Sequence, residues 1–237
     1  MFVSFLASAA LGLAAAPDAP GDIAEALIET TGSPGAAVAR ACAGELATGI
    51  AGHRIAGGDA AVQPGDLWHM GSNTKAMTAT LAARLVEQGV ISWDATIGRS
   101  LSGLDLDIDE ALRSATLEAL LAHRAGLKPN AGLNTALRLR GADADRNPQA
   151  DRLVYARAVL GEAGGPQGDY RYSNAGYVIA AMMMEQAAGA PYEALMAREV
   201  FEPLGLESAG WGPPGEPGRA DQPRGHGSGL FGGLDAR

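Results

Sequence analysis

Four side chains in this sequence could together carry out nucleophilic catalysis, and two of them, Ser72 and Lys75, occur in "SNTK". This stretch starts an expected helix, and residues three apart lie on one helix face, so Oγ and Nζ can come close together. A serine hydroxyl is a weak nucleophile until a base takes its proton, which a neutral lysine amine can do. The helix N-terminus adds partial positive charge that would stabilise an alkoxide. The spacing therefore suits a nucleophile at Ser72.

Lysine is rare in this chain, which sharpens the interpretation of Lys75. Of 18 Lys plus Arg residues, only Lys75 and Lys128 are lysine. Arginine keeps its proton in proteins, whereas lysine can give it up. The alternative, a helix-capping serine beside a solvated lysine, remains open at this point.

The second motif is "YSN", in which Tyr172 and Asn174 precede another expected helix. A phenol held near a lysine ammonium can become a phenolate and act as general base. An asparagine side chain can hold both the lysine and a substrate carbonyl. Separately, a core tyrosine and a helix-capping asparagine would explain these residues, but two such motifs in one chain favour catalysis.

Apolar periodicity and end signals predict the elements that would position these residues. Apolar residues recur at helical spacing from Asn73 to Gly89, where glycine can end the helix. Asn147 as N-cap and proline at the next position predict a helix over Pro148–Glu162. Two apolar runs predict a hairpin, and the Gly- and Pro-rich stretch from Gly210 predicts loop. The remaining predicted helices are Gly21–Gly32, Leu117–His123, Ala175–Ala187 and Pro191–Val200, and the hairpin strands are Ala36–Cys42 and Leu46–His53.

Composition limits the classes of protein to which the chain can belong. It is 47% hydrophobic and 19% charged over 237 residues, which suits one globular unit with a substantial core. The net charge of -9 argues against nucleic acid and anionic membranes as partners. The single cysteine, Cys42, excludes an intrachain disulfide and is expected to be buried. Met182–Met184 are expected to fill the core. The four histidines are scattered without metal-ligand spacing, so no metal is predicted.

The N-terminus predicts a leader over residues 1–20. An apolar stretch runs from Phe2 to Ala16, is too short to span a bilayer, and ends in an A-x-A-like site. This pattern predicts export to the periplasm or the medium, with a folded domain over residues 21–237. A misplaced start codon, or a core helix in a cytoplasmic protein, are the alternatives.

The order of the two motifs resembles the class C beta-lactamase family of serine hydrolases, which includes D-alanyl-D-alanine carboxypeptidases and esterases. In that family S-x-x-K precedes Y-x-N, as Ser72 and Lys75 precede Tyr172 here. The stretch "LEALLAHRAGL", Leu117–Leu127, resembles the helix that the family carries between them. Penicillin-recognising enzymes with S-D-N in the middle position are less similar.

The resemblance implies roles for these residues and a fold. Ser72 would be the acylated nucleophile, Lys75 and Tyr172 would share the proton transfer, and Asn174 would orient the substrate. The implied fold class is α/β of the α+β type, with a helical subdomain beside an antiparallel sheet. No cofactor is implied, and the partner would be a small-molecule or peptide substrate, whether a beta-lactam, a D-alanyl peptide or an ester.

The family's third motif, K-T-G or H-x-G on a strand, has no clear counterpart. "GHGSG", Gly225–Gly229, lies too close to Tyr172, and His226 is expected to be an ordinary loop residue. We therefore expect a C-terminal truncation that removes sheet strands and leaves weak or no activity. Two alternatives remain: a non-catalytic penicillin- or peptide-binding module, and a helical structural domain with coincidental motifs.

Overall fold

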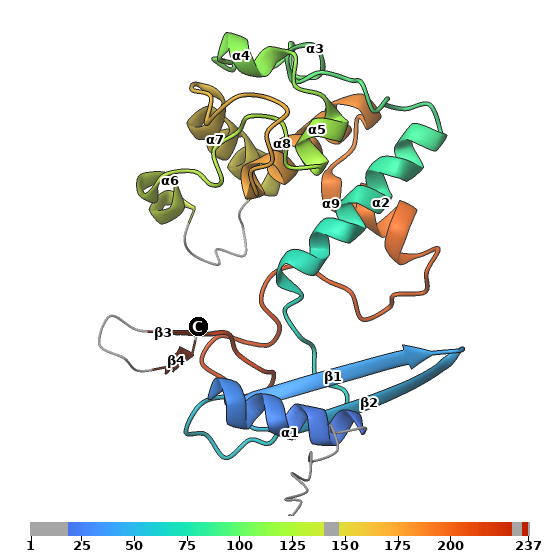
Figure 1. The fold of residues 1–237 in the computed structure, drawn as a ribbon, viewed down its shortest axis with the longest axis vertical. Helices are drawn as coiled ribbons and strands as arrows, with labels where there is room; N and C mark the ends of the chain where they lie inside the picture. Colours follow the sequence, from blue (N-terminus) through green and yellow to red (C-terminus); the bar gives the residue numbers. More distant parts are fainter. Residues whose placement is uncertain (1–18, 140–146, 229–233, 237) are drawn as a thin grey trace, which may run out of the picture. The chain divides into compact units, whose positions relative to one another are not determined.

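The computed structural model describes residues 19–139, 147–228 and 234–236, which form two compact units. The first takes in the described residues of Met1–His69 and Trp211–Arg237, and the second takes in those of Met70–Gly210. An antiparallel hairpin and one helix dominate the first unit, and helices make up the second (Figure 1). This combination confirms the predicted α+β class. The predicted leader lies almost wholly outside the described residues, and it and the domain over 21–237 stay predictions.

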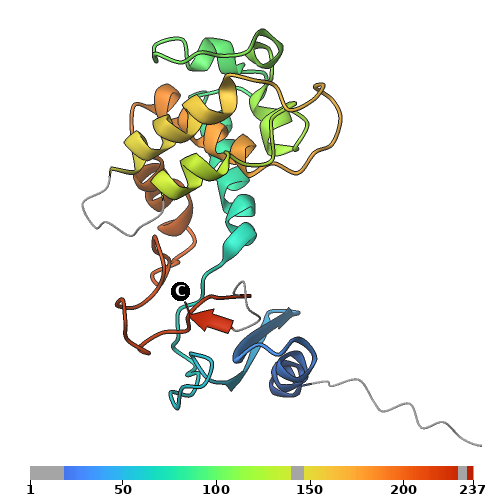
Figure 2. The ribbon, with the colours of Figure 1, turned by 90° about the vertical axis from the view of Figure 1, so that its left-hand side faces the viewer.

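The first unit begins with helix α1 (Pro20–Thr31), followed by strands β1 (Gly35–Cys42) and β2 (Glu45–Gly52). The strands pair antiparallel, and α1 packs against both of them, as Figure 2 shows from a second direction. A Cβ added at Gly49 of β2 would lie 2.2 Å from the backbone nitrogen of Gly21, so the close approach of α1 requires glycine. The predicted helix and hairpin are confirmed.

The tip of the hairpin differs from the prediction. Cys42 pairs with Glu45 beside the turn and is exposed, and Leu46 next to them is 70% exposed. The expectation that Cys42 is buried was wrong, because the second half of β1 is exposed throughout. The turn itself is made by Ala43 and Gly44, with φ angles of 49° and 86°.

The turn residue Ala43 offers a stability test. Both turn residues have positive φ, as type I′ hairpins require, and asparagine tolerates that conformation far better than alanine. We expect Ala43→Asn to raise the free energy of unfolding by about 1 kcal/mol. Chemical denaturation followed by circular dichroism measures this, with Ala41→Asn on exposed β1 as the control. A loss of stability in Ala43→Asn would contradict the turn geometry.

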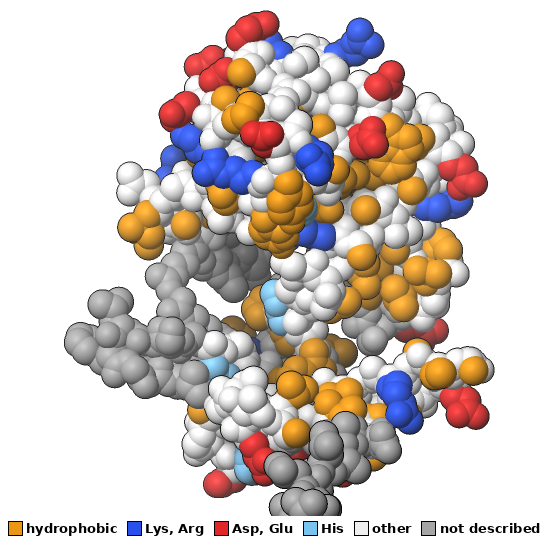
Figure 3. All heavy atoms as spheres, viewed as in Figure 1, with side chains coloured by type: hydrophobic (Ala, Val, Ile, Leu, Met, Phe, Trp, Pro, Cys, Tyr) orange, Lys and Arg blue, Asp and Glu red, His pale blue; other side chains and the backbone are white. Residues whose placement is uncertain are grey.

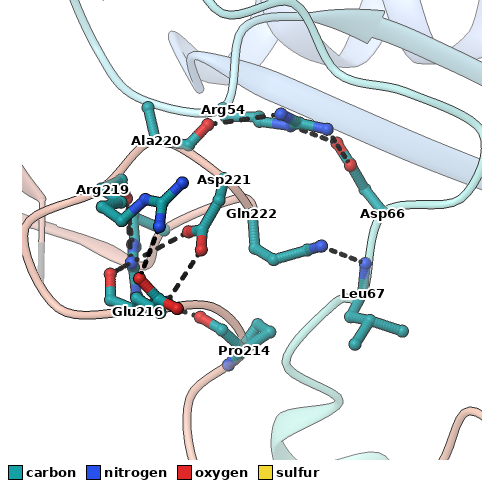
Figure 4. Close-up of polar contacts among 10 residues, drawn as sticks. Arg54, Asp66, Leu67, Pro214, Glu216, Arg219, Ala220, Asp221 and Gln222 are labelled. Atoms are coloured by element: carbon teal, nitrogen blue, oxygen red, sulfur yellow. Dashed lines mark hydrogen bonds and ion pairs between the residues drawn. The ribbon is translucent and has the colours of Figure 1, made fainter.

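The long C-terminal loop of the first unit is fixed by polar contacts (Figure 4). Arg54 donates from Nε to Asp66 Oδ2 at 2.8 Å and from Nη1 to the carbonyl of Ala220 at 3.3 Å. The backbone N–H of Leu67 donates to Gln222 Oε1 at 2.7 Å. These contacts join residues 54–67 to the stretch around residue 220, far away in sequence.

Two short strands follow this loop, β3 (His226–Ser228) and β4 (Leu234–Ala236), which pair antiparallel. The prediction that His226 is an ordinary loop residue was wrong. Its backbone pairs with Ala236, and its Nε2 accepts a hydrogen bond of 3.0 Å from the N–H of Ala56. Gly- and Pro-rich sequence carries no strand signal, so these distant contacts and not local propensity decide the conformation here.

The second unit is helical and has one core. Its apolar core residues come from nearly every helix of the unit. The helices are α2 (Thr74–Glu87), α3 (Ile97–Ser100), α4 (Glu110–Arg113), α5 (Leu117–Leu121), α6 (Leu133–Arg138), α7 (Pro148–Leu160), α8 (Asn174–Ala188) and α9 (Tyr192–Met196), with a 3₁₀ turn over Gly71–Asn73 and a π-helical turn over Ala197–Phe201.

The predicted helices of this unit are confirmed, with shifted ends. Asn147 caps α7 by accepting hydrogen bonds from the next two N–H groups past Pro148. The helix predicted over Leu117–His123 ends at Leu121, and the one predicted over Pro191–Val200 becomes π-helical at Ala197. The single-turn helices α3, α4 and α6 are too short to show apolar periodicity.

Helix α8 is the central element of the second unit. It packs against α2, α3, α5, α7 and α9, and Met182–Met184 are buried as predicted. A Cβ added at Gly176 would lie 2.9 Å from the carbonyl oxygen of Leu120, so glycine allows α8 to lie close to α5. This packing fixes the start of α8, where Asn174 lies.

A largely buried ion cluster joins α7, α8 and α9. Arg152 donates to Glu185 at 2.6 Å and to Glu193 at 2.7 Å, and the three side chains are 14%, 5% and 25% exposed. Burial opposes the ionisation of Glu193, but the hydrogen bonds and charge of Arg152 outweigh it and lower the pKa of Glu193. Arg152 and Glu193 therefore stay ionised, and the cluster holds three helices together.

Removing the cation of this cluster should destabilise the second unit. Arg152→Met leaves Glu185 buried without its partner, which typically costs about 3–5 kcal/mol. Arg157→Met is the matched control, because Arg157 pairs with Asp105 on the surface, where such a pair contributes less than about 1 kcal/mol. Urea unfolding of both variants measures the difference, and equal losses would contradict a structural role for the cluster.

Charged side chains of both signs are interspersed over the visible face of the helical unit (Figure 3). Among the helices that the structure describes, none combines the length and apolar character needed to cross a membrane.

Candidate active site

The start of α2 presents Ser72 and Lys75. Gly71 has a φ of 53°, a left-handed conformation that glycine adopts without strain, and the 3₁₀ turn over Gly71–Asn73 leads into the helix. Ser72 is exposed and Lys75 is half-buried. The nucleophile candidate thus lies at the end of a rigid element, open to an approaching substrate.

Ser72 Oγ contacts both candidate proton carriers. It shares a hydrogen bond of 2.8 Å with Tyr172 Oη and accepts one of 3.1 Å from Lys75 Nζ. Lys75 Nζ also lies 4.9 Å from the centroid of the Tyr172 ring. The structure therefore brings together a hydroxyl, an ammonium and a phenol from positions 100 residues apart.

Asn174 completes the group. Its Oδ1 accepts a hydrogen bond of 2.7 Å from Lys75 Nζ, and its Nδ2 donates one of 2.8 Å to Asn130 Oδ1. The amide is therefore oriented with its oxygen toward the lysine. All four side chains predicted from the sequence lie within one hydrogen-bonded cluster of the second unit.

The structural alternatives for these residues do not fit the geometry. The α2 start has no side-chain cap, and Ser72 Oγ bonds to side chains instead. Ser173, not Asn174, caps α8, since its Oγ accepts the N–H of Gly176 at 3.1 Å. Tyr172 is 42% exposed and is no core residue.

The surroundings of Tyr172 favour its phenolate form. The interaction with the Lys75 ammonium, and then the hydrogen bond with Ser72, lower the pKa of the phenol from its usual value of 10.0. A phenolate beside the serine hydroxyl can accept its proton, and the ammonium compensates the negative charge. The arrangement can therefore activate Ser72 for attack on a carbonyl carbon.

Sequence reasoning missed two residues of this cluster. Asn130 lies in the loop before α6 and orients Asn174, and His123 lies against Tyr172, with ring centroids 4.5 Å apart. Both contacts join distant segments. His123 lies in the stretch Leu117–Leu127 that resembles the family, but the sequence alone indicates no contact between it and Tyr172. The described residues hold no group of three or more His, Cys, Asp or Glu placed to bind a metal ion.

Comparison with known proteins agrees with this geometry. The Beta-lactamase family model matches residues 22–232. Penicillin-binding protein 4 of Amycolatopsis lactamdurans is 32% identical over 179 residues, which cover 74% of this chain and 44% of that protein. Among solved structures, the octameric penicillin-binding protein homologue from Pyrococcus abyssi has a TM-score of 0.70 at 22% identity, covering 90% of this chain and 48% of that one. The D-amino acid amidase from Ochrobactrum anthropi SV3 has a TM-score of 0.69 at 23% identity, covering 91% of this chain and 59% of that one.

The α+β fold and the family-model match point to the same class of protein. The chain belongs to the beta-lactamase family. It spans 44% of the curated relative and about half of the matched structures, and at these identities the structures show the fold alone.

The pKa of Tyr172 gives a direct test of the cluster. Lys75→Met removes the larger cause of the lowered pKa, so we expect the Tyr172 pKa to rise toward 10.0. NMR titration of ¹³Cζ-labelled tyrosine measures it, with Tyr172→Phe to assign the signal. Lys128→Met, at the other lysine of the chain, should leave the titration unchanged, and identical curves for both lysine variants would refute the interaction.

Proposed function

We propose that this chain acts as a serine hydrolase that forms an acyl-enzyme through Ser72 on a small amide, ester or beta-lactam. The observation that carries the proposal is the pair of hydrogen bonds at Ser72 Oγ, one shared with Tyr172 Oη and one accepted from Lys75 Nζ. Membership of the beta-lactamase family supports it. Exposure of Ser72 supports it further, because a nucleophile must be reachable.

In the proposed first step Ser72 Oγ forms a bond to the carbonyl carbon of the substrate. Tyr172 takes the Ser72 proton and, with Lys75, passes it to the leaving amine or alcohol as the carbon–nitrogen or carbon–oxygen bond breaks. Water then attacks the carbonyl carbon of the acyl-enzyme. Tyr172 and Lys75 take the proton of the water and return one to Ser72 Oγ as the acid is released. Asn174 holds Lys75 through its oxygen, and the second hydrogen of its Nδ2 can donate to the substrate.

Covalent labelling tests the proposed nucleophile. The chain is incubated with a fluorophosphonate and, separately, with a fluorescent penicillin, and its intact mass is measured over time. We expect one adduct per chain, none in Ser72→Ala, and labelling slower by at least about 10²-fold in Lys75→Arg, because arginine keeps its proton and cannot pass one on. Ser208→Ala and Lys128→Arg are the matched controls and should label like the parent chain. An adduct that survives in Ser72→Ala would overturn the proposal.

A binding module is the second candidate, because a relative that is 32% identical is named a penicillin-binding protein. A binding module would be acylated and would hold the acyl group. Release of product from a chromogenic ester or beta-lactam distinguishes the two candidates. The hydrolase releases more than one equivalent per chain, whereas the binding module stops at or below one.

A further inference from the structure

His123 has a backbone conformation that few non-glycine residues adopt. Its φ is 61°, and within the described part of the chain Ala43 is the other non-glycine residue with positive φ. It lies two residues past the end of α5, outside regular structure. A histidine held in the left-handed region indicates that surrounding contacts impose the conformation.

His123 contacts Tyr172 and the residues on either side of it in the sequence. The carbonyl oxygen of His123 accepts a hydrogen bond of 2.8 Å from the N–H of Arg171. Its Nδ1 accepts one of 3.1 Å from the N–H of Ser173. Its ring lies against the Tyr172 ring, with centroids 4.5 Å apart and planes inclined by 35°. One residue thus contacts three consecutive residues with the phenol in the middle.

These contacts determine where the phenolic oxygen lies. Tyr172 is 42% exposed, so the core alone does not fix its ring. A displacement of about 1 Å of a reacting group can cost about 10²-fold in rate. Holding the backbone on both sides of Tyr172, and one face of its ring, keeps Oη within 2.8 Å of Ser72 Oγ.

Resting on the proposed acylation through Ser72, we propose that His123 is a positioning residue whose neutral imidazole holds Tyr172 beside the nucleophile. It accepts hydrogen bonds from the neighbours of Tyr172 and would act on Ser72 through that tyrosine.

The charge state of His123 matters for this role. Four side chains face its ring: Lys75 of α2, Tyr170 and Tyr172 of the loop before α8, and Tyr177 of α8. Burial, and then the charge of Lys75, lower the pKa of His123 below its usual 6.5. Protonation at acid pH would put a hydrogen on Nδ1, remove the acceptor for the Ser173 N–H and place a second cation near Lys75. The hold on Tyr172 should therefore be lost as the pH falls through this lowered pKa.

His123→Asn tests the role with little risk to folding. Asparagine tolerates positive φ and carries an acceptor oxygen, but it has no ring to support Tyr172. We expect the maximal rate of fluorophosphonate labelling to fall at least tenfold, while the concentration for half-maximal rate stays within twofold. The thermal midpoint should stay near that of the parent. His53→Asn, in the first unit, is the matched control and should change neither constant.

A pH profile of the same reaction adds a readout that a purely structural residue would not move. As the pH falls below 6.5, the labelling rate of the parent should depend on one more proton than the rate of His123→Asn does, because only the parent carries the imidazole. Equal rates within twofold and parallel profiles would overturn the positioning role while the proposed function stands.

If the parent chain forms no adduct, the proposed function fails, and the titration of ¹³Cζ-labelled Tyr172 decides the positioning role separately. A higher Tyr172 pKa in His123→Asn would support it, because the phenol would no longer be held near Lys75. An unchanged pKa would overturn it.

Discussion

The ammonium of Lys75 is the interaction on which the site depends. One cation donates to Ser72 at the start of α2 and to Asn174 at the start of α8, and it lies over the ring of Tyr172. The N-termini of two helices, each with partial positive charge, therefore meet at a lysine. Such a concentration of positive charge favours the two anions that the proposed acylation needs, a phenolate and an alkoxide.

Much of the second unit serves to keep those two helix starts together. Gly176 lets α8 lie close to α5, and the cap by Ser173 fixes the residue before Asn174. Farther along, Thr78 of α2 shares a hydrogen bond of 2.7 Å with Tyr192, and the Arg152 cluster ties α8 to α7 and α9. Polar contacts within the core thus fix how these helices lie relative to one another. Apolar packing alone would determine that position less specifically.

Local signals in the sequence predicted most elements, and they singled out the four side chains that the structure brings into one hydrogen-bonded cluster. Asn147 and Gly32 mark helix ends by their own chemistry, and the spacing of Ser72 and Lys75 places both on one helix face. The failures lie where distant contacts decide. Cys42 lies in the exposed second half of β1, and His226 joins a strand and accepts a hydrogen bond from Ala56, which is remote in sequence. The contacts of His123 likewise depend on a loop fifty residues away, for which the sequence gives no signal.

The central claim is that Lys75 and Tyr172 activate Ser72 as one unit. A double-mutant cycle on the rate of Ser72 labelling, with Lys75→Met, Tyr172→Phe and the combined variant, tests it most directly. Residues that act together lose most of their effect at the first substitution, so the account predicts that the combined variant is scarcely slower than the slower single variant. Losses that multiply, as for two independent residues, would contradict it.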